Sequence, residues 1–145
     1  MDTESSNIEG GPQRSQPESF RGRDLNASLT VNDLEKSLAW YCDVMGFTVE
    51  RRIEREGKLV AVSLKAGAVG IAIGQDNGAK GFDRVKGEGF SLQITTAQNI
   101  DELAARVKAT GTTLDTEPMD TPWGARVFRV KDPDGFKYTI SSGNP

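Results

Sequence analysis

Residues 29–47 read LTVNDLEKSLAWYCDVMGF, and this stretch decides the fold. Just before and within it, apolar Ala27, Leu29 and Val31 alternate with polar side chains, a pattern that predicts a half-buried strand. Asn32 or Asp33 is suited to cap a helix, and apolar side chains then recur at helical spacing from Leu34 to Met45. Gly46 is the residue type that ends helices, so the stretch predicts a strand followed by one helix.

Outward from this stretch, the same order of elements occurs twice. Three strands are predicted after the first helix, at Phe47–Arg55, Leu59–Lys65 and Val69–Gly74. A glycine-rich linker, 76–89, precedes an alternating run from Phe90 to Ile94, a helix from Ile100 to Thr110 ended by Gly111, and strands at Thr112–Glu117, Ala125–Lys131 and Phe136–Ser142. The repeat predicts an α+β domain over 24–145, built from two βαβββ modules at 24–75 and 90–142.

Composition narrows the function classes. The net charge is −3 and the basic residues are scattered, so we expect neither nucleic-acid binding nor a membrane partner. The single cysteine, Cys42, is expected to be a buried structural thiol and fits a reducing, cytoplasmic location. Residues 1–23 are polar and are expected to form a flexible arm. The alternative is an arm that docks on a partner subunit, anchored by Phe20.

Two motifs resemble a known superfamily. The first is the opening stretch quoted above, and the second combines Pro122-Trp123-Gly124-Ala125-Arg126-Val127-Phe128 with Asp132-Pro133-Asp134-Gly135. Together they resemble the vicinal oxygen chelate superfamily, which includes glyoxalase I, bleomycin-resistance proteins and extradiol dioxygenases. The resemblance implies the glyoxalase/bleomycin-resistance fold, in which two modules form curved mixed sheets around a cleft. It also implies a homodimer.

In the metal enzymes of that superfamily, four residues that face the cleft hold an ion. The resemblance places these positions at Asn26, Ala72, Ser91 and Thr139. The chain has no histidine, Ala72 offers no donor atom, and the other three offer only neutral oxygens or an amide. Because catalytic transition metals require imidazole, thiolate or carboxylate, we expect no metal, no other cofactor and no metal-dependent catalysis. No residue is assigned a catalytic role.

The pattern of the strands separates a face toward the helices from a polar face of small side chains. Such a face is typical of a wet ligand cleft, although side chains of a neighbouring module could also fill it. Trp123 could stack on a planar ligand, and Arg126 or Arg129 could pair with an anionic group, although a solvated arginine is the simpler interpretation. The ligand-binding residues predicted on this basis are Asn26, Ser28, Ala72, Ser91, Gln93, Trp123, Arg126 and Thr139.

Three functions remain open. The first is a metal-free binding protein of the bleomycin-resistance type, which sequesters a planar or aromatic molecule in the clefts of a homodimer. The second is a metal-independent isomerase or lyase of the same fold, and the third is a regulatory module that senses a metabolite. Whether the chain is an enzyme is not decided by these residues, although the missing histidine argues against it.

Overall fold

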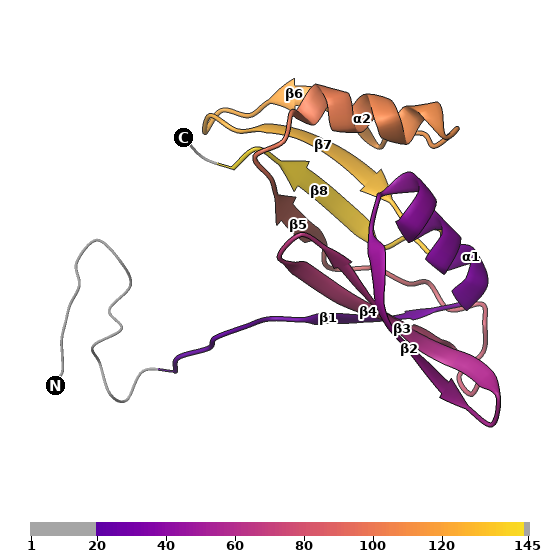
Figure 1. Ribbon diagram of the computed structural model, residues 1–145. Helices are drawn as coiled ribbons and strands as arrows, with labels where there is room; N and C mark the ends of the chain where they lie inside the picture. Colours follow the sequence, from indigo (N-terminus) through magenta and orange to yellow (C-terminus); the bar gives the residue numbers. More distant parts are fainter. Residues whose placement is uncertain (1–19, 144–145) are drawn as a thin grey trace, which may run out of the picture.

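The computed structural model describes residues 20–143, which form two four-stranded mixed sheets with one helix each (Figure 1). The first sheet has the order β1-β4-β3-β2, with β1 parallel to β4 and the other pairs antiparallel. Its strands are β1 (Ala27–Val31), β2 (Thr48–Arg55), β3 (Lys58–Ala66) and β4 (Val69–Gln75). The predicted first module is therefore present, with strand ends that differ by at most one residue.

The second sheet repeats this arrangement in the order β5-β8-β7-β6. Its strands are β5 (Leu92–Thr95), β6 (Thr116–Asp120), β7 (Arg126–Lys131) and β8 (Lys137–Ser141), and its helix is α2 (Ile100–Ala109). Strand β6 begins later than predicted. Pro118 lacks an N–H group, and the pairing with β7 shifts between Thr116 and Met119, as is common where proline lies in an edge strand. The predicted α+β class and its two βαβββ modules are confirmed.

The first helix departs from the prediction of one continuous α-helix. It is α-helical only at α1 (Leu34–Ala39) and continues as the π-helix η1 (Trp40–Val44). Asp33 caps the first helix and Asn99 caps α2 in the same way, each by accepting a hydrogen bond from the backbone three residues on. The helix after Asp33 is one residue longer before its terminal glycine, and a π-turn accommodates such an extra residue.

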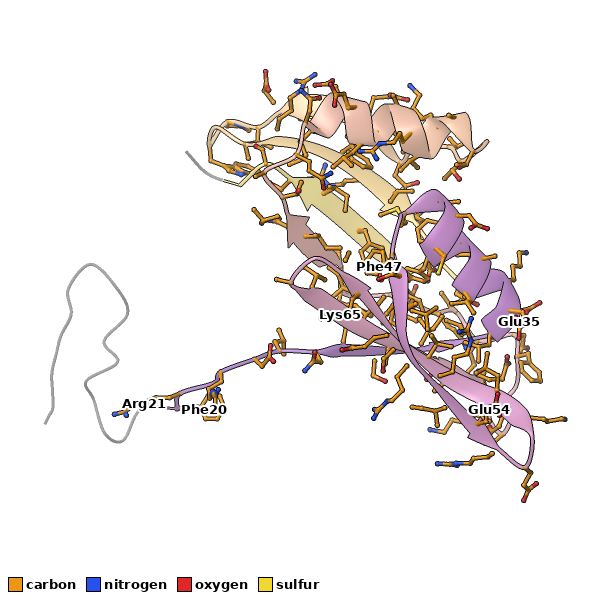
Figure 2. All side chains as sticks on the ribbon, viewed as in Figure 1. Phe20, Arg21, Glu35, Phe47, Glu54 and Lys65 are labelled. Carbon is orange, nitrogen blue, oxygen red and sulfur yellow. The ribbon has the colours of Figure 1, made fainter. Side chains whose placement is uncertain are left out.

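The two modules share one hydrophobic core. The helix-facing side chains Leu29, Ile73, Phe128 and Ile140 belong to a single buried cluster, so the predicted division of the strands into two faces holds. Figure 2 shows Phe47 pointing into this core. Because both helix-facing sides pack on a common core, the polar face of each sheet points away from the other module.

Tyr41 connects the modules through a buried hydrogen-bonded chain. Its hydroxyl donates to Asp132 Oδ2 over 2.8 Å and lies 2.8 Å from the Tyr138 hydroxyl, which must then be the donor in that pair. Asp132 Oδ1 accepts from the backbone N–H groups of Asp134 and Phe136, as expected for a turn. The turn at 132–135 is thus also an inter-module contact, which the sequence did not predict.

Residues 76–89, predicted as a linker, contain no helix or strand, but they are held in place. Asp76 is buried and accepts from Lys86 Nζ at 2.7 Å and from Arg84 Nη2 at 3.0 Å. The Lys86 ammonium beside it holds the pKa of Asp76 well below its usual range. Gly87 has a φ of +79°, and a Cβ there would overlap the carbonyl of Gly135. Charge pairing therefore holds this segment together, and close backbone packing at Gly87 holds it against the second module.

The predicted arm of residues 1–23 lies mostly outside the described residues. Its described end, together with the residues up to Asn26, runs as an extended segment away from the sheets (Figure 1). Phe20 and Leu25 are almost fully exposed there, at 96% and 94%. Within residues 20–143, no helix is long and apolar enough to cross a membrane.

Candidate functional site

Each polar sheet face carries one row of side chains that runs straight across all four strands. The first row contains Ser28 on β1, Ala72 on β4, Ser63 on β3 and Arg51 on β2. The second row contains Gln93 on β5, Thr139 on β8, Arg129 on β7 and Thr116 on β6. Side chains directly opposite one another on neighbouring strands share a face and lie within contact distance. The structure therefore brings four of the predicted residues into two matched rows: Ser28, Ala72, Gln93 and Thr139.

Arg129 is the charged residue at the centre of the second row. It is half-buried, and its Nε donates to Thr139 Oγ1 over 3.2 Å. Among residues 20–143, no carboxylate pairs with Arg129, whereas Lys131 on the same strand pairs with Asp115 at 3.6 Å. The terminal N–H groups of Arg129 are therefore available to an acceptor that Thr139 helps to align. Such groups bind planar oxyanions well.

Three other residues that were predicted to bind a ligand lie outside the two rows. Asn26 and Ser91 come just before β1 and β5, two residues ahead of the rows, and both are exposed. Trp123 lies in the turn between β6 and β7 and is 61% exposed. This exposure leaves its ring available to a ligand, but the structure does not bring it against Thr139 or Arg129. Stacking by Trp123 thus stays a prediction.

Arg126 does not belong with these residues. It lies on the helix side of β7, where its guanidinium donates to both carboxylate oxygens of Asp101 at 2.8 and 2.9 Å and to Asp120 at 3.0 Å. Asp101 is on α2, so Arg126 joins the helix to the sheet. Residues 126 and 129 are an odd number of positions apart, and odd separations in a strand point to opposite faces. The role of Arg126 as a ligand contact stays a prediction, but its guanidinium is already paired with two carboxylates, and Arg129 is the arginine on the polar face.

The residues at the implied metal positions do not fit a metal. Asn26 and Ser91 are exposed just ahead of β1 and β5, Ala72 has no donor atom, and the Thr139 hydroxyl accepts from Arg129, so the four positions offer only one amide and two hydroxyls. Residues 20–143 contain no group of three or more histidine, cysteine, aspartate or glutamate side chains that could hold an ion. Neutral oxygens alone do not hold a catalytic zinc, iron or nickel ion.

Cys42 is half-buried rather than fully buried. Burial, with the charge of Asp43 as a smaller contribution, raises the pKa of its thiol. Because the thiolate is the nucleophilic form, this shift makes Cys42 less reactive near neutral pH. The expectation of a structural thiol is consistent with this environment, although the burial of Cys42 is only partial.

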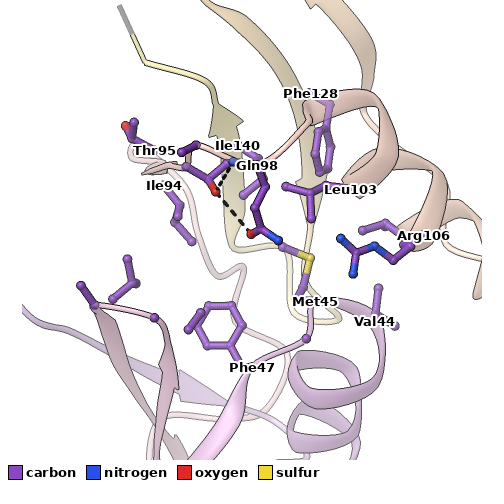
Figure 3. A pocket seen from close by; sticks show the side chains of 18 of the residues that line it. Val44, Met45, Phe47, Ile94, Thr95, Gln98, Leu103, Arg106, Phe128 and Ile140 are labelled. Carbon is purple, nitrogen blue, oxygen red and sulfur yellow. Dashed lines mark hydrogen bonds between the residues drawn. The ribbon is translucent and has the colours of Figure 1, made fainter.

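The chain also contains a cavity that the sequence did not predict. It lies on the helix side of the sheets, between the modules, and has a volume of about 720 Å³ (Figure 3). Apolar side chains form most of its wall, including Phe47, Ile94, Leu103 and Ile140. No sequence period indicates a volume that is left unfilled, so only the packing of the two modules reveals it. It is separate from the polar rows, which lie on the opposite side of the sheets.

Comparison with known proteins identifies the family to which this chain is similar. Residues 25–140 match the Glyoxalase/Bleomycin resistance protein/Dioxygenase superfamily. The chain is 30% identical to a probable lactoylglutathione lyase of Vibrio cholerae, over 81% of this chain and 88% of that one. It is 26% identical to a lactoylglutathione lyase of Arabidopsis thaliana, over 89% of this chain. It spans about half of that plant protein, 47% of its length.

The fold agrees with this assignment. The crystal structure of TioX from Micromonospora sp. ML1 superimposes with a TM-score of 0.67 at 21% identity, covering 83% of this chain and 98% of TioX. At that identity the likeness shows the fold alone. The fold and the family match together define the class of this protein. It is a class built from two βαβββ modules whose sheets have polar faces. The chain belongs to the Glyoxalase/Bleomycin resistance protein/Dioxygenase superfamily.

Proposed function

We propose that this chain is a metal-independent, cytoplasmic binding protein of the bleomycin-resistance type. Its ligand would be a planar, aromatic molecule that carries an oxyanion or a carbonyl group. The observation that carries the proposal is the second row, where Arg129 stands beside Thr139, Thr139 stands beside Gln93, and Arg129 has no carboxylate partner among residues 20–143. Small neutral side chains leave room for a flat ring, and the arginine supplies a fork of donors for its polar edge.

The proposal includes a homodimer. The two polar faces of one chain point away from their shared core, so they do not face each other within that chain. A second copy can place its second row opposite the first row of its neighbour and enclose a ligand between them. The outer strands β1 and β5 of the two sheets supply edges for such pairing. Light scattering at micromolar concentration should give the mass of two chains, and the mass of one chain would contradict this part.

A metal-independent isomerase or lyase is the second candidate, because the Vibrio and Arabidopsis relatives are named lactoylglutathione lyases. Neither row contains a carboxylate or an imidazole side chain that could transfer a proton. Binding without turnover therefore ranks first. Conversion of a bound ligand by the purified protein would reverse this order.

The binding test uses two fluorescent probes with the same rings. Anilinonaphthalene sulfonate carries an anionic group, and phenylnaphthylamine lacks it. Arg129→Gln should weaken the sulfonate about tenfold, the order expected for loss of one charged hydrogen bond, and should leave phenylnaphthylamine unchanged. Ala72→Phe, which fills the first row, should weaken both probes.

Arg126→Gln is the matched control, because it removes an arginine from the same strand but from the opposite face. It should change neither affinity. Thermal unfolding of each variant checks that the fold is retained. Equal losses of both probes in Arg129→Gln, or no loss of either, would contradict the role of Arg129.

A further inference from the structure

The inter-module cavity arises because the two junctions of this repeated fold are filled differently. Each junction lies between the helix of one module and the strand-connecting turn of the other. At the first junction, Tyr41 from the helix segment of module one reaches the turn at 132–135 of module two. Counted from the capping residues Asp33 and Asn99, Val107 occupies the same helix position in module two.

The second junction lacks both of the groups that fill the first. Val107 is much smaller than tyrosine, and the turn on the module-one side of the cavity, between β3 and β4, contains only Gly67 and Ala68. Both Val107 and this turn line the cavity of about 720 Å³. The cavity is therefore a consequence of the sequence at one junction, and its volume is within the range of about 300–1,000 Å³ that is usual for ligand pockets.

Two hydrogen-bond donors lie at the wall of this otherwise apolar space. In Figure 3, the side chains of Gln98 and Arg106 reach toward Met45. The oxygen of the Gln98 amide accepts from the Thr96 hydroxyl at 3.4 Å, which leaves its nitrogen as the free end. Among residues 20–143, neither that nitrogen nor the Arg106 guanidinium has a hydrogen-bond or ion-pair partner. An acceptor group on a ligand would satisfy both.

Asp43 is the one acidic side chain that lines the cavity. It is exposed and forms no ion pair with Arg106. A cationic ligand would have only this carboxylate, whereas an anionic ligand would have an arginine and an amide together. The side-chain donors of Gln98 and Arg106 therefore favour an acidic ligand over an amine.

We propose that this cavity is a second binding site, for amphipathic carboxylic acids with a flexible apolar chain. The chain would lie against Phe47, Leu103 and Phe128, and the carboxylate would accept hydrogen bonds from Gln98 and Arg106. This site is independent of the polar rows, because it lies on the other side of the sheets and prefers a different ligand shape.

The probes are decanoate, decanol and decylamine. Each is titrated into the isotope-labelled full-length protein, and the backbone amide signals are followed by NMR. Decanoate should give saturable shifts around Ala68, Gln98 and Arg106, and should leave Gln93 and Thr139 unchanged. Arg106→Gln should weaken decanoate about three- to fivefold, as expected for an exposed charge pair, and should leave decanol unchanged. Lys108→Gln is the matched control on the same helix, where Lys108 instead pairs with Glu117.

Two variants fill the cavity. Ala68→Trp changes an exposed turn residue and should abolish decanoate binding without unfolding the protein. Val107→Phe narrows the same space from the helix, and Ala68→Trp still decides the question if Val107→Phe does not fold. The absence of saturable shifts, or decanoate binding that survives Ala68→Trp, would overturn the site. Shifts confined to the polar rows would also overturn it, while they would support the function proposed above.

The amine arm tests the charge preference. Decylamine that binds more tightly than decanoate, with loss on Asp43→Asn, would overturn the assignment of an acid. Decanoate binding that is unchanged or tighter in Asp43→Asn would support it.

Discussion

Tyr41 and Tyr138 are the two tyrosines of the chain, and their hydroxyl groups meet in the interior between the modules. Burial is the main cause that raises the pKa of both phenols above the usual value of about 10. The nearby Asp132 carboxylate acts in the same direction. The pKa of each phenol is higher in the folded chain than in the unfolded chain. Their contribution to stability is therefore fully present below about pH 10 and is lost as the pH rises beyond it.

This arrangement predicts a coupled alkaline transition. The ultraviolet absorbance of tyrosinate should stay low at pH values where exposed tyrosine ionises, and should rise together with unfolding measured by circular dichroism. Tyr41→Phe should lower stability at pH 7 by about 1–3 kcal/mol, because it leaves a buried acceptor on Asp132 unsatisfied. It should also make stability less sensitive to pH above 10. Tyrosinate absorbance that rises near pH 10 while the protein remains folded would contradict this account.

Single residues also show how far the sequence predicts the site. The shared face of Ser28, Ala72, Gln93 and Thr139 could be predicted because a strand fixes the face of every second side chain. The choice between the two arginines on β7 required the strand register and the position of Asp101 on α2, which lies far away in sequence. Long-range pairing of this kind is not encoded in a local pattern.

At the level of elements, the fold was predictable because the same order of strands and helix occurs twice. The observed elements differ from the predicted ones where the two modules differ from each other. The apolar spacing of the first helix is compatible with one α-helix, but the η1 segment contains an extra residue and forms a π-turn. That turn belongs to the segment that carries Tyr41, whose bond to Asp132 is a tertiary contact. The helix periodicity alone did not predict it.

The 76–89 segment provides a test of packing between elements. Gly87 and Gly89 both have positive φ, +79° and +82°, but a Cβ at Gly87 would overlap Gly135, whereas a Cβ at Gly89 would meet no atom within 4 Å. Gly89→Ala should therefore cost only the backbone penalty of about 1–2 kcal/mol, and Gly87→Ala should cost clearly more. Chemical denaturation of the two variants measures the difference. Equal losses would mean that the contact between this segment and the 132–135 turn adds nothing to stability.

On the scale of the whole molecule, the chain has no histidine, and the two rows across the sheets contain no carboxylate or thiol side chain. After exhaustive dialysis, elemental analysis should find no stoichiometric zinc, iron, manganese or nickel. Adding each ion back should leave the unfolding temperature unchanged, because a ligand that binds only the folded state would raise it. A stoichiometric metal, or a saturable rise in that temperature, would refute the metal-independent function.

The unequal junctions also bear on how such a protein can change over generations. The chain consists of two similar modules, and one of their two junctions holds them together through Tyr41 and Asp132. Because the first junction holds the modules together, the residues of the second junction, including Ala68 and Val107, are not needed for that contact. Substitutions at the second junction can therefore change what the cavity accepts, while the Tyr41–Asp132 contact at the first junction preserves the architecture.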